Sequence, residues 1–101
     1  MDSSLTSYLV RLKDRIYYLL VLREREENGF DAHFSQCAVG LSERMNGALE
    51  RFPELAAHDA YTDAIDAIAF CAGKDVSLQH IRTHILNTIN DIDRLIAKLE
   101  A

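Results

Sequence analysis

Residues 5–22 read LTSYLVRLKDRIYYLLVL, and their apolar pattern is typical of a long amphipathic helix. Apolar side chains recur at steps of four and three residues, which places them on one helix face: Leu5, Leu9, Leu12, Ile16 and Leu19. From Ile16 to Leu22 every position is apolar or aromatic, so this half of the helix is apolar around its whole circumference. We therefore expect it to be covered on more than one side, by helices of this chain or by a second chain.

Length and composition indicate one soluble globular domain spanning residues 1–101. Hydrophobic residues make up 49% of the chain and charged residues 27%, which is ordinary for such a domain. Four glycines and one proline are too few for a turn-rich β-sandwich. A membrane span needs about 18 apolar residues, whereas Arg15 and Arg23 closely flank the apolar run.

The charge balance and the first residues indicate an acidic, cytoplasmic protein that does not bind nucleic acid. The net charge is −5, and the sequence shows no basic face for a phosphate backbone. The opening residues, MDSSLTSYLV, lack the basic start and the cleavage site of a signal peptide. In the cytosol Cys37 and Cys71 are expected to be reduced, and their apolar neighbours favour buried thiols.

Turn-forming and capping residues divide the chain into four expected helices, over residues 4–28, 31–52, 54–72 and 77–100. Gly29 and Gly73 supply helix stops, Pro53 ends the second helix, and Ser77 caps the fourth. Short connections predict antiparallel neighbours, so we expect an all-α, up-down four-helix bundle. The alternative is a set of helical hairpins that is completed by dimerisation.

Two glycines lie inside the second expected helix. Gly40 and Gly47 each weaken a helix interior by about 1 kcal/mol relative to alanine. Either they are tolerated weaknesses or a local kink, or they allow another backbone to approach closely. The sequence leaves both explanations open.

The third expected helix carries an acidic face. Asp59, Asp63 and Asp66 recur at steps of four and three residues, and Phe70 follows at the same edge. We expect this face to be solvated, or to be a docking surface for a basic partner with Phe70 as its apolar anchor. A Mg²⁺-dependent, all-helical nucleotide hydrolase is the alternative function, since three carboxylates could hold Mg²⁺. However, the sequence shows no convincing second set of carboxylates on another helix.

No motif in the chain identifies a catalytic residue or a cofactor. His80 and His84 are four residues apart, a spacing that suits Zn²⁺, but no third ligand is fixed nearby. They are therefore weak metal candidates, and ordinary exposed histidines are the expectation. The chain is more consistent with a non-enzymatic function than with an enzyme.

The first helix is more apolar than a four-helix monomer requires, because of Tyr8, Tyr17, Tyr18 and Val21. Tyrosine is favoured at protein interfaces because one end is apolar and the other is hydrated. These residues are either core or the interface of a homodimer or a partner protein. We expect a small non-catalytic interaction or regulatory protein, of the general kind that includes immunity proteins, chaperones and inhibitors.

Overall fold

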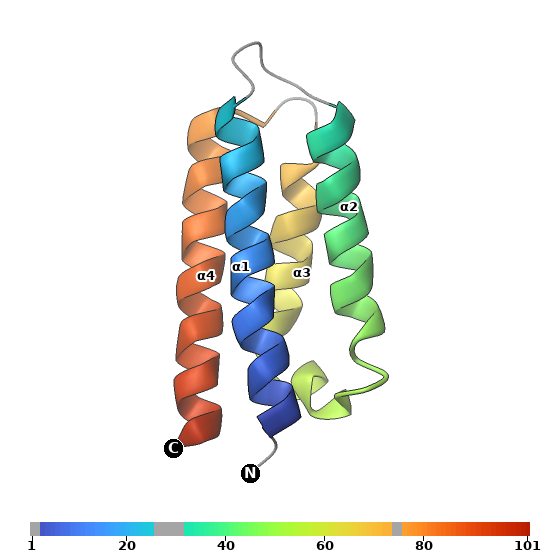
Figure 1. The fold of residues 1–101 in the computed structure, drawn as a ribbon, viewed down its shortest axis with the longest axis vertical. Coiled ribbons are helices and arrows are strands. Elements are labelled where there is room, and N and C mark those ends of the chain that lie inside the picture. The colour runs from blue at the N-terminus through green and yellow to red at the C-terminus, as the bar shows by residue number, and fades with distance from the viewer. Residues whose placement is uncertain (1–2, 26–31, 74–75) are drawn as a thin grey trace.

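A computed structural model describes residues 3–25, 32–73 and 76–101, and within these ranges it confirms the expected all-α bundle (Figure 1). The helices are α1 (Ser3–Arg25), α2 (Ala32–Gly47), α3 (Asp59–Cys71) and α4 (Leu78–Glu100), with a short 3₁₀ helix, η1 (Pro53–Ala57), before α3. Successive helices run in opposite directions, so the start of α1 and the end of α4 lie at the same end of the bundle (Figure 1). None of the described helices is long and apolar enough to cross a membrane.

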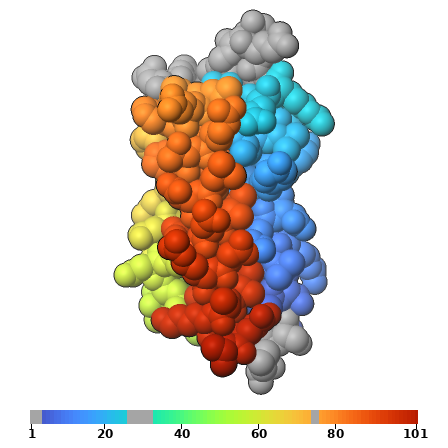
Figure 2. Space-filling model, turned by 90° about the vertical axis from the view of Figure 1, so that its left-hand side faces the viewer, coloured from blue at the N-terminus to red at the C-terminus, as the bar shows by residue number. Residues whose placement is uncertain are grey.

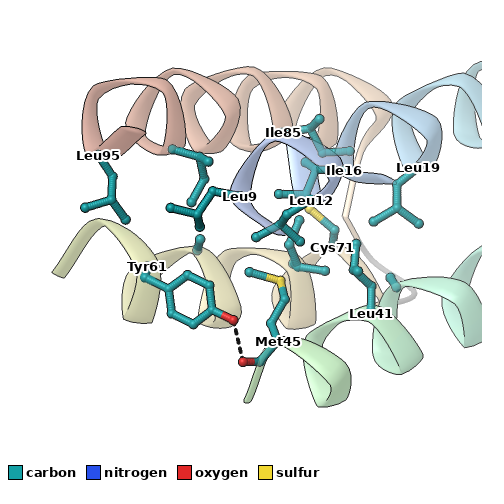
Figure 3. Packing of buried hydrophobic residues seen from close by; sticks show 14 of the residues in the cluster. Leu9, Leu12, Ile16, Leu19, Leu41, Met45, Tyr61, Cys71, Ile85 and Leu95 are labelled. Carbon is teal, nitrogen blue, oxygen red and sulfur yellow. Dashed lines mark hydrogen bonds between the residues drawn. The ribbon is translucent and has the colours of Figure 1, made fainter. Parts of the chain in front are cut away.

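The apolar stripe of α1 lies in the middle of one continuous core. Leu9 and Ile16 are completely buried, and Leu12 and Leu19 are nearly so. Figure 3 shows these side chains lying among residues of the other three helices, such as Ile85. Helix α4 contributes an isoleucine at most of its buried turns: Ile81, Ile85, Ile92 and Ile96. The stripe found in the sequence is thus the central contact surface of the fold.

Helix α4 packs against both α1 and α3, and Figure 2 shows it lying between them. Two ion pairs span the α1–α4 seam. Lys13 pairs with Asp93, and Arg82 donates to Glu24 at 3.1 Å. One pair lies near the middle of the seam and the other near one end, and both support the antiparallel register of these helices. Helix α2 packs closely on α3 but more loosely on α1.

The second helix is shorter than predicted. It ends at Gly47 instead of residue 52, and its expected start at residue 31 lies outside the described residues. The N–H of Leu49 donates to the carbonyl of Asn46 at 3.2 Å, which is tighter than the helical pattern. The carbonyl of Met45 instead accepts a hydrogen bond from the hydroxyl of Tyr61 at 2.5 Å (Figure 3). A tertiary hydrogen bond therefore satisfies a carbonyl at the end of α2.

The helix predicted over residues 54–72 is divided into η1 and α3. Phe52 and Leu55 are both buried, and they close the end of the core where α2 ends. Pro53 begins η1, a position that tolerates its missing N–H. His58 then has φ −107° and ψ 110°, which is extended backbone, so a continuous helix cannot pass through it. The division lets Phe52 and Leu55, on either side of Pro53, both reach the core.

The first and fourth predicted helices agree with α1 and α4 within the described residues, although residues 26–28 lie outside them. The two glycines of α2 do not mark a close approach of another backbone. A Cβ added at Gly40 would meet only Nη2 of Arg44 at 3.7 Å, and one added at Gly47 would meet nothing within 4 Å. Gly40 is thus a tolerated weakness in the helix, and Gly47 is its last residue.

Candidate functional site

Three of the predicted interface residues lie on the side of α1 that faces away from the core. Tyr17 is 54% exposed and Tyr18 is 53% exposed, and Val10 beside them is 44% exposed. Val21 lies one turn further along and is half-buried. We call Val10, Tyr17, Tyr18 and Val21 the outer face of α1.

The fourth predicted interface residue, Tyr8, lies apart from this face. Its ring stacks on Phe52 with 5.5 Å between centroids. Its hydroxyl lies 2.7 Å from the hydroxyl oxygen of Tyr61. Because the single proton of Tyr61 is donated to Met45, Tyr8 donates to Tyr61. Tyr8 therefore links α1 to α3 and to the residue that precedes η1 within the chain.

A groove of about 640 Å³ runs between α1 and α2, where these helices pack loosely. Four arginines line it: Arg11 and Arg15 from α1, Arg44 from α2, and Arg51 from the turn after α2. We call this the arginine groove. Within the described part of the chain, no acidic side chain lines it and none of the four arginines forms an ion pair.

Cations from both walls of the arginine groove act on the hydroxyl group of Tyr8. Burial raises the pKa of Tyr8, while its bond to Tyr61 and the cations of Arg15 and Arg51 partly oppose that rise. Arg51 also lies over the ring of Phe52, 4.8 Å from its centroid. Arg15 and Arg51 thus approach one point from α1 and from the turn after α2.

The expectation that the chain has no basic face is therefore wrong. The basic residues come from α1 and from α2 with the turn that follows it, so no single segment looks basic. A weak signal was present in the first helix, because Arg11 and Arg15 are four residues apart and so lie on one helix face. Helical spacing does not account for Arg51, because α2 ends at Gly47.

The acidic face of α3 is exposed as predicted, but cations of α4 lie beside it. Asp59 and Asp63 line a hollow of about 490 Å³ together with Asp91, Arg94 and Lys98 of α4. Arg94 also pairs with Asp91 at 3.6 Å. The hollow is thus mixed in charge, and Asp66 does not line it.

Phe70 and the two histidines lie near the other end of α3. Phe70 is 54% exposed, and its ring meets that of His84 edge-on at 5.1 Å between centroids. His80 is exposed, and its backbone N–H donates to the capping hydroxyl of Ser77. Among the residues that the structure describes, no three cysteine, histidine or acidic side chains are grouped to hold a metal ion.

The two cysteines are free thiols in different environments. Cys71 is buried, as predicted, and burial raises the pKa of its thiol to about 11. Cys37 is only half-buried, and its sulfur lies 3.8 Å from Nε2 of His33 one turn earlier. The expectation of a buried thiol therefore holds fully for Cys71 alone.

No family model, curated protein or solved structure matches this chain. The four-helix fold does not itself define a function, because unrelated functions occur on the same architecture. Function must therefore be inferred from the outer face of α1, the arginine groove and the acidic face of α3.

Proposed function

We propose that this chain is a small, non-catalytic protein-interaction protein that self-associates through the outer face of α1. The observation that carries the proposal is that Tyr17 and Tyr18 are both more than half exposed on one helix. Large aromatic side chains are enriched at protein interfaces, where they bury much apolar area and keep the hydroxyl hydrated. Val10 and Val21 extend the apolar surface along the same helix.

The core of the bundle is closed without these tyrosines. Leu9, Ile16 and Tyr61 fill its centre and are completely buried. Among the described residues, every buried side-chain nitrogen or oxygen atom has a hydrogen-bond partner. Tyr17 and Tyr18 therefore lie outside the group of buried residues that forms the core.

A two-fold contact would bring the outer face of α1 against the same face of a second copy. Most homodimers are of this self-complementary kind, in which one surface is used by both copies. Such a contact would cover Tyr17 and Tyr18 in both subunits. The opposite side of α1, including Tyr8, would stay within its own subunit.

The non-catalytic and cytoplasmic parts of the proposal have separate support. The hollow that Asp59, Asp63 and Asp91 line is also lined by Arg94 and Lys98, whose positive charges oppose the binding of Mg²⁺ there. Two cysteines that form no disulfide agree with a reducing compartment.

Light scattering coupled to size exclusion, at two protein concentrations, tests the self-association. The wild type is expected to be dimeric, and the double variant Tyr17→Ala/Tyr18→Ala is expected to be monomeric with unchanged helix content by circular dichroism. Phe70→Ala is the matched control, because Phe70 is equally exposed but lies on α3. A wild type that is monomeric at both concentrations, or a double variant that unfolds, contradicts the proposal.

A further inference from the structure

The arginine groove is unusual because its two walls carry the same charge. Arg11 and Arg15 project from α1, while Arg44 and Arg51 belong to the opposite wall. Like charges that face each other repel, and this repulsion opposes close packing of the two walls. The loose packing of α1 on α2 is consistent with that repulsion.

Three of these arginines have an acidic neighbour in the sequence that does not line the groove. Asp14 precedes Arg15, Glu43 precedes Arg44, and Glu50 precedes Arg51. All three are exposed, and none of them lines the groove. A chain of net charge −5 thus keeps four of its eleven Lys and Arg residues together on one groove.

The size and chemistry of the groove fit a compact anion better than a long apolar segment. Leu12, Leu41 and Met45 form its floor but are almost completely buried, so they offer little apolar surface. Its volume of about 640 Å³ lies within the range of small-molecule sites, roughly 300–1,000 Å³. The accessible polar groups include the four guanidinium groups and the hydroxyls of Ser4 and Ser7.

Guanidinium groups recognise phosphate through paired N–H···O bonds, because their planar fork matches two phosphate oxygens. Two phosphate monoester groups carry about three to four negative charges between them at neutral pH. That charge balances the four arginines of the groove. A ligand with two such groups could contact both walls at once.

We propose that the arginine groove binds a small molecule that carries two phosphate groups, one contacted from each wall. None of the four outer-face residues lines the groove, so the groove is built without the side chains proposed for self-association. Binding of such a ligand also explains why four arginines line one groove. The phosphate groups supply the negative charge that the lining residues lack.

Isothermal titration at fixed ionic strength tests the proposal with fructose 1,6-bisphosphate and inorganic pyrophosphate as probes. Citrate is the control anion, because it carries comparable charge on carboxylates. At least one phosphate probe is expected to bind at least about tenfold more tightly than citrate. In a thermal melt, the same probe should raise Tm by several degrees. Added salt should weaken the binding.

Two double variants remove the walls separately: Arg11→Gln/Arg15→Gln for α1, and Arg44→Gln/Arg51→Gln for the opposite wall. Each is expected to weaken binding by at least about tenfold, because each removes charge-assisted hydrogen bonds. Arg25→Gln/Arg94→Gln is the matched control. It removes the same charge from exposed arginines outside the groove and should change affinity less than threefold.

Four results would overturn the proposal. These are no binding of either phosphate probe at millimolar concentration, equal binding of citrate, binding that survives both wall variants, and loss in only one of them. Circular dichroism melts of the unliganded variants show whether each is folded. If Tyr17→Ala/Tyr18→Ala is monomeric yet still binds the probe, the two proposals are separated.

Discussion

The α1–α4 seam and the arginine groove lie on two sides of the same helix, and their charges are arranged differently. Across the seam, Lys13 meets Asp93 and Glu24 meets Arg82, so each charge has an opposite partner. Across the groove, four arginines face one another with no acidic side chain among the lining residues that the structure describes. Where α1 serves to hold the bundle together, charges are paired. Where it borders α2, the four arginines of the groove have no acidic partner among the described residues, which leaves a surface suited to an external anion.

The largest expected effect tests the buried bond beside the groove. Tyr61→Phe leaves the carbonyl of Met45 without its donor and Tyr8 without its acceptor. The free energy of unfolding should fall by about 1–3 kcal/mol, measured by urea denaturation. Tyr17→Phe is the control, and it should change stability by less than about 0.5 kcal/mol because Tyr17 is exposed. A loss at Tyr61 no larger than the control would mean that this bond does not hold the end of α2.

Raising the pH should also lower the stability of the fold, through the buried hydroxyl of Tyr61 and the buried thiol of Cys71. Burial raises the pKa of Tyr61 above its ordinary value of 10.0 and that of Cys71 from 9.0 to about 11. Above pH 9, and more so above pH 10, the unfolded chain therefore binds fewer protons than the folded chain, so stability falls as pH rises. Stability curves between pH 8 and pH 11 should show this decline. Cys71→Ala should remove the part of the decline between about pH 9 and pH 11 that comes from this thiol, and a flat wild-type curve would contradict the prediction.

Substitution of Gly40 tests whether a glycine inside α2, the second wall of the groove, lowers the stability of that helix. A Cβ there would be in ordinary contact with Arg44 and with nothing closer. Gly40→Ala should therefore raise the free energy of unfolding by about 1 kcal/mol, through the higher helix propensity of alanine. Chemical denaturation measures the gain, and Gly47→Ala should gain less because Gly47 is the last residue of α2. Destabilisation by Gly40→Ala would show that the wall needs a glycine.

The smallest effect compares the charges on the two sides of α1 directly. Lys13→Gln should lower stability by about 0.2–1 kcal/mol, because it breaks an exposed ion pair. Arg15→Gln should instead leave stability unchanged or raise it by a few tenths of a kcal/mol, because it removes like-charge repulsion. High salt should reduce both differences. If both substitutions change the free energy of unfolding in the same direction in low salt, the charges on the α4 side and the α2 side of α1 do not differ as described.

The sequence predicted the bundle because its information is local. Leu9 and Ile16 follow the helical period, and each buried helix face could be read in the same way without knowing its neighbours. The division near Pro53 was missed because it depends on Phe52 and Leu55 both reaching the core. That requirement arises only when the helices are assembled.

The candidate sites depended on which residues meet across helices, so the sequence predicted them less well. Tyr8 and Tyr18 look alike in the sequence, yet Tyr8 contacts Phe52 and Tyr61 while Tyr18 remains exposed. The arginine groove joins a pair of arginines on α1 to a pair from α2 and the turn after it, and neither pair alone is notable in an acidic chain. Proximity of this kind cannot be read from periodicity.

The buried turns of α4 are built largely from isoleucine, such as Ile81, Ile85 and Ile92. A β-branched side chain in a helix adopts essentially one χ1 rotamer, so its rotational freedom is already lost when the helix forms. When α4 then docks between α1 and α3, little further conformational entropy is given up, far less than unbranched methionines would lose. Once helical, α4 therefore presents to its neighbours a contact surface whose shape is already set.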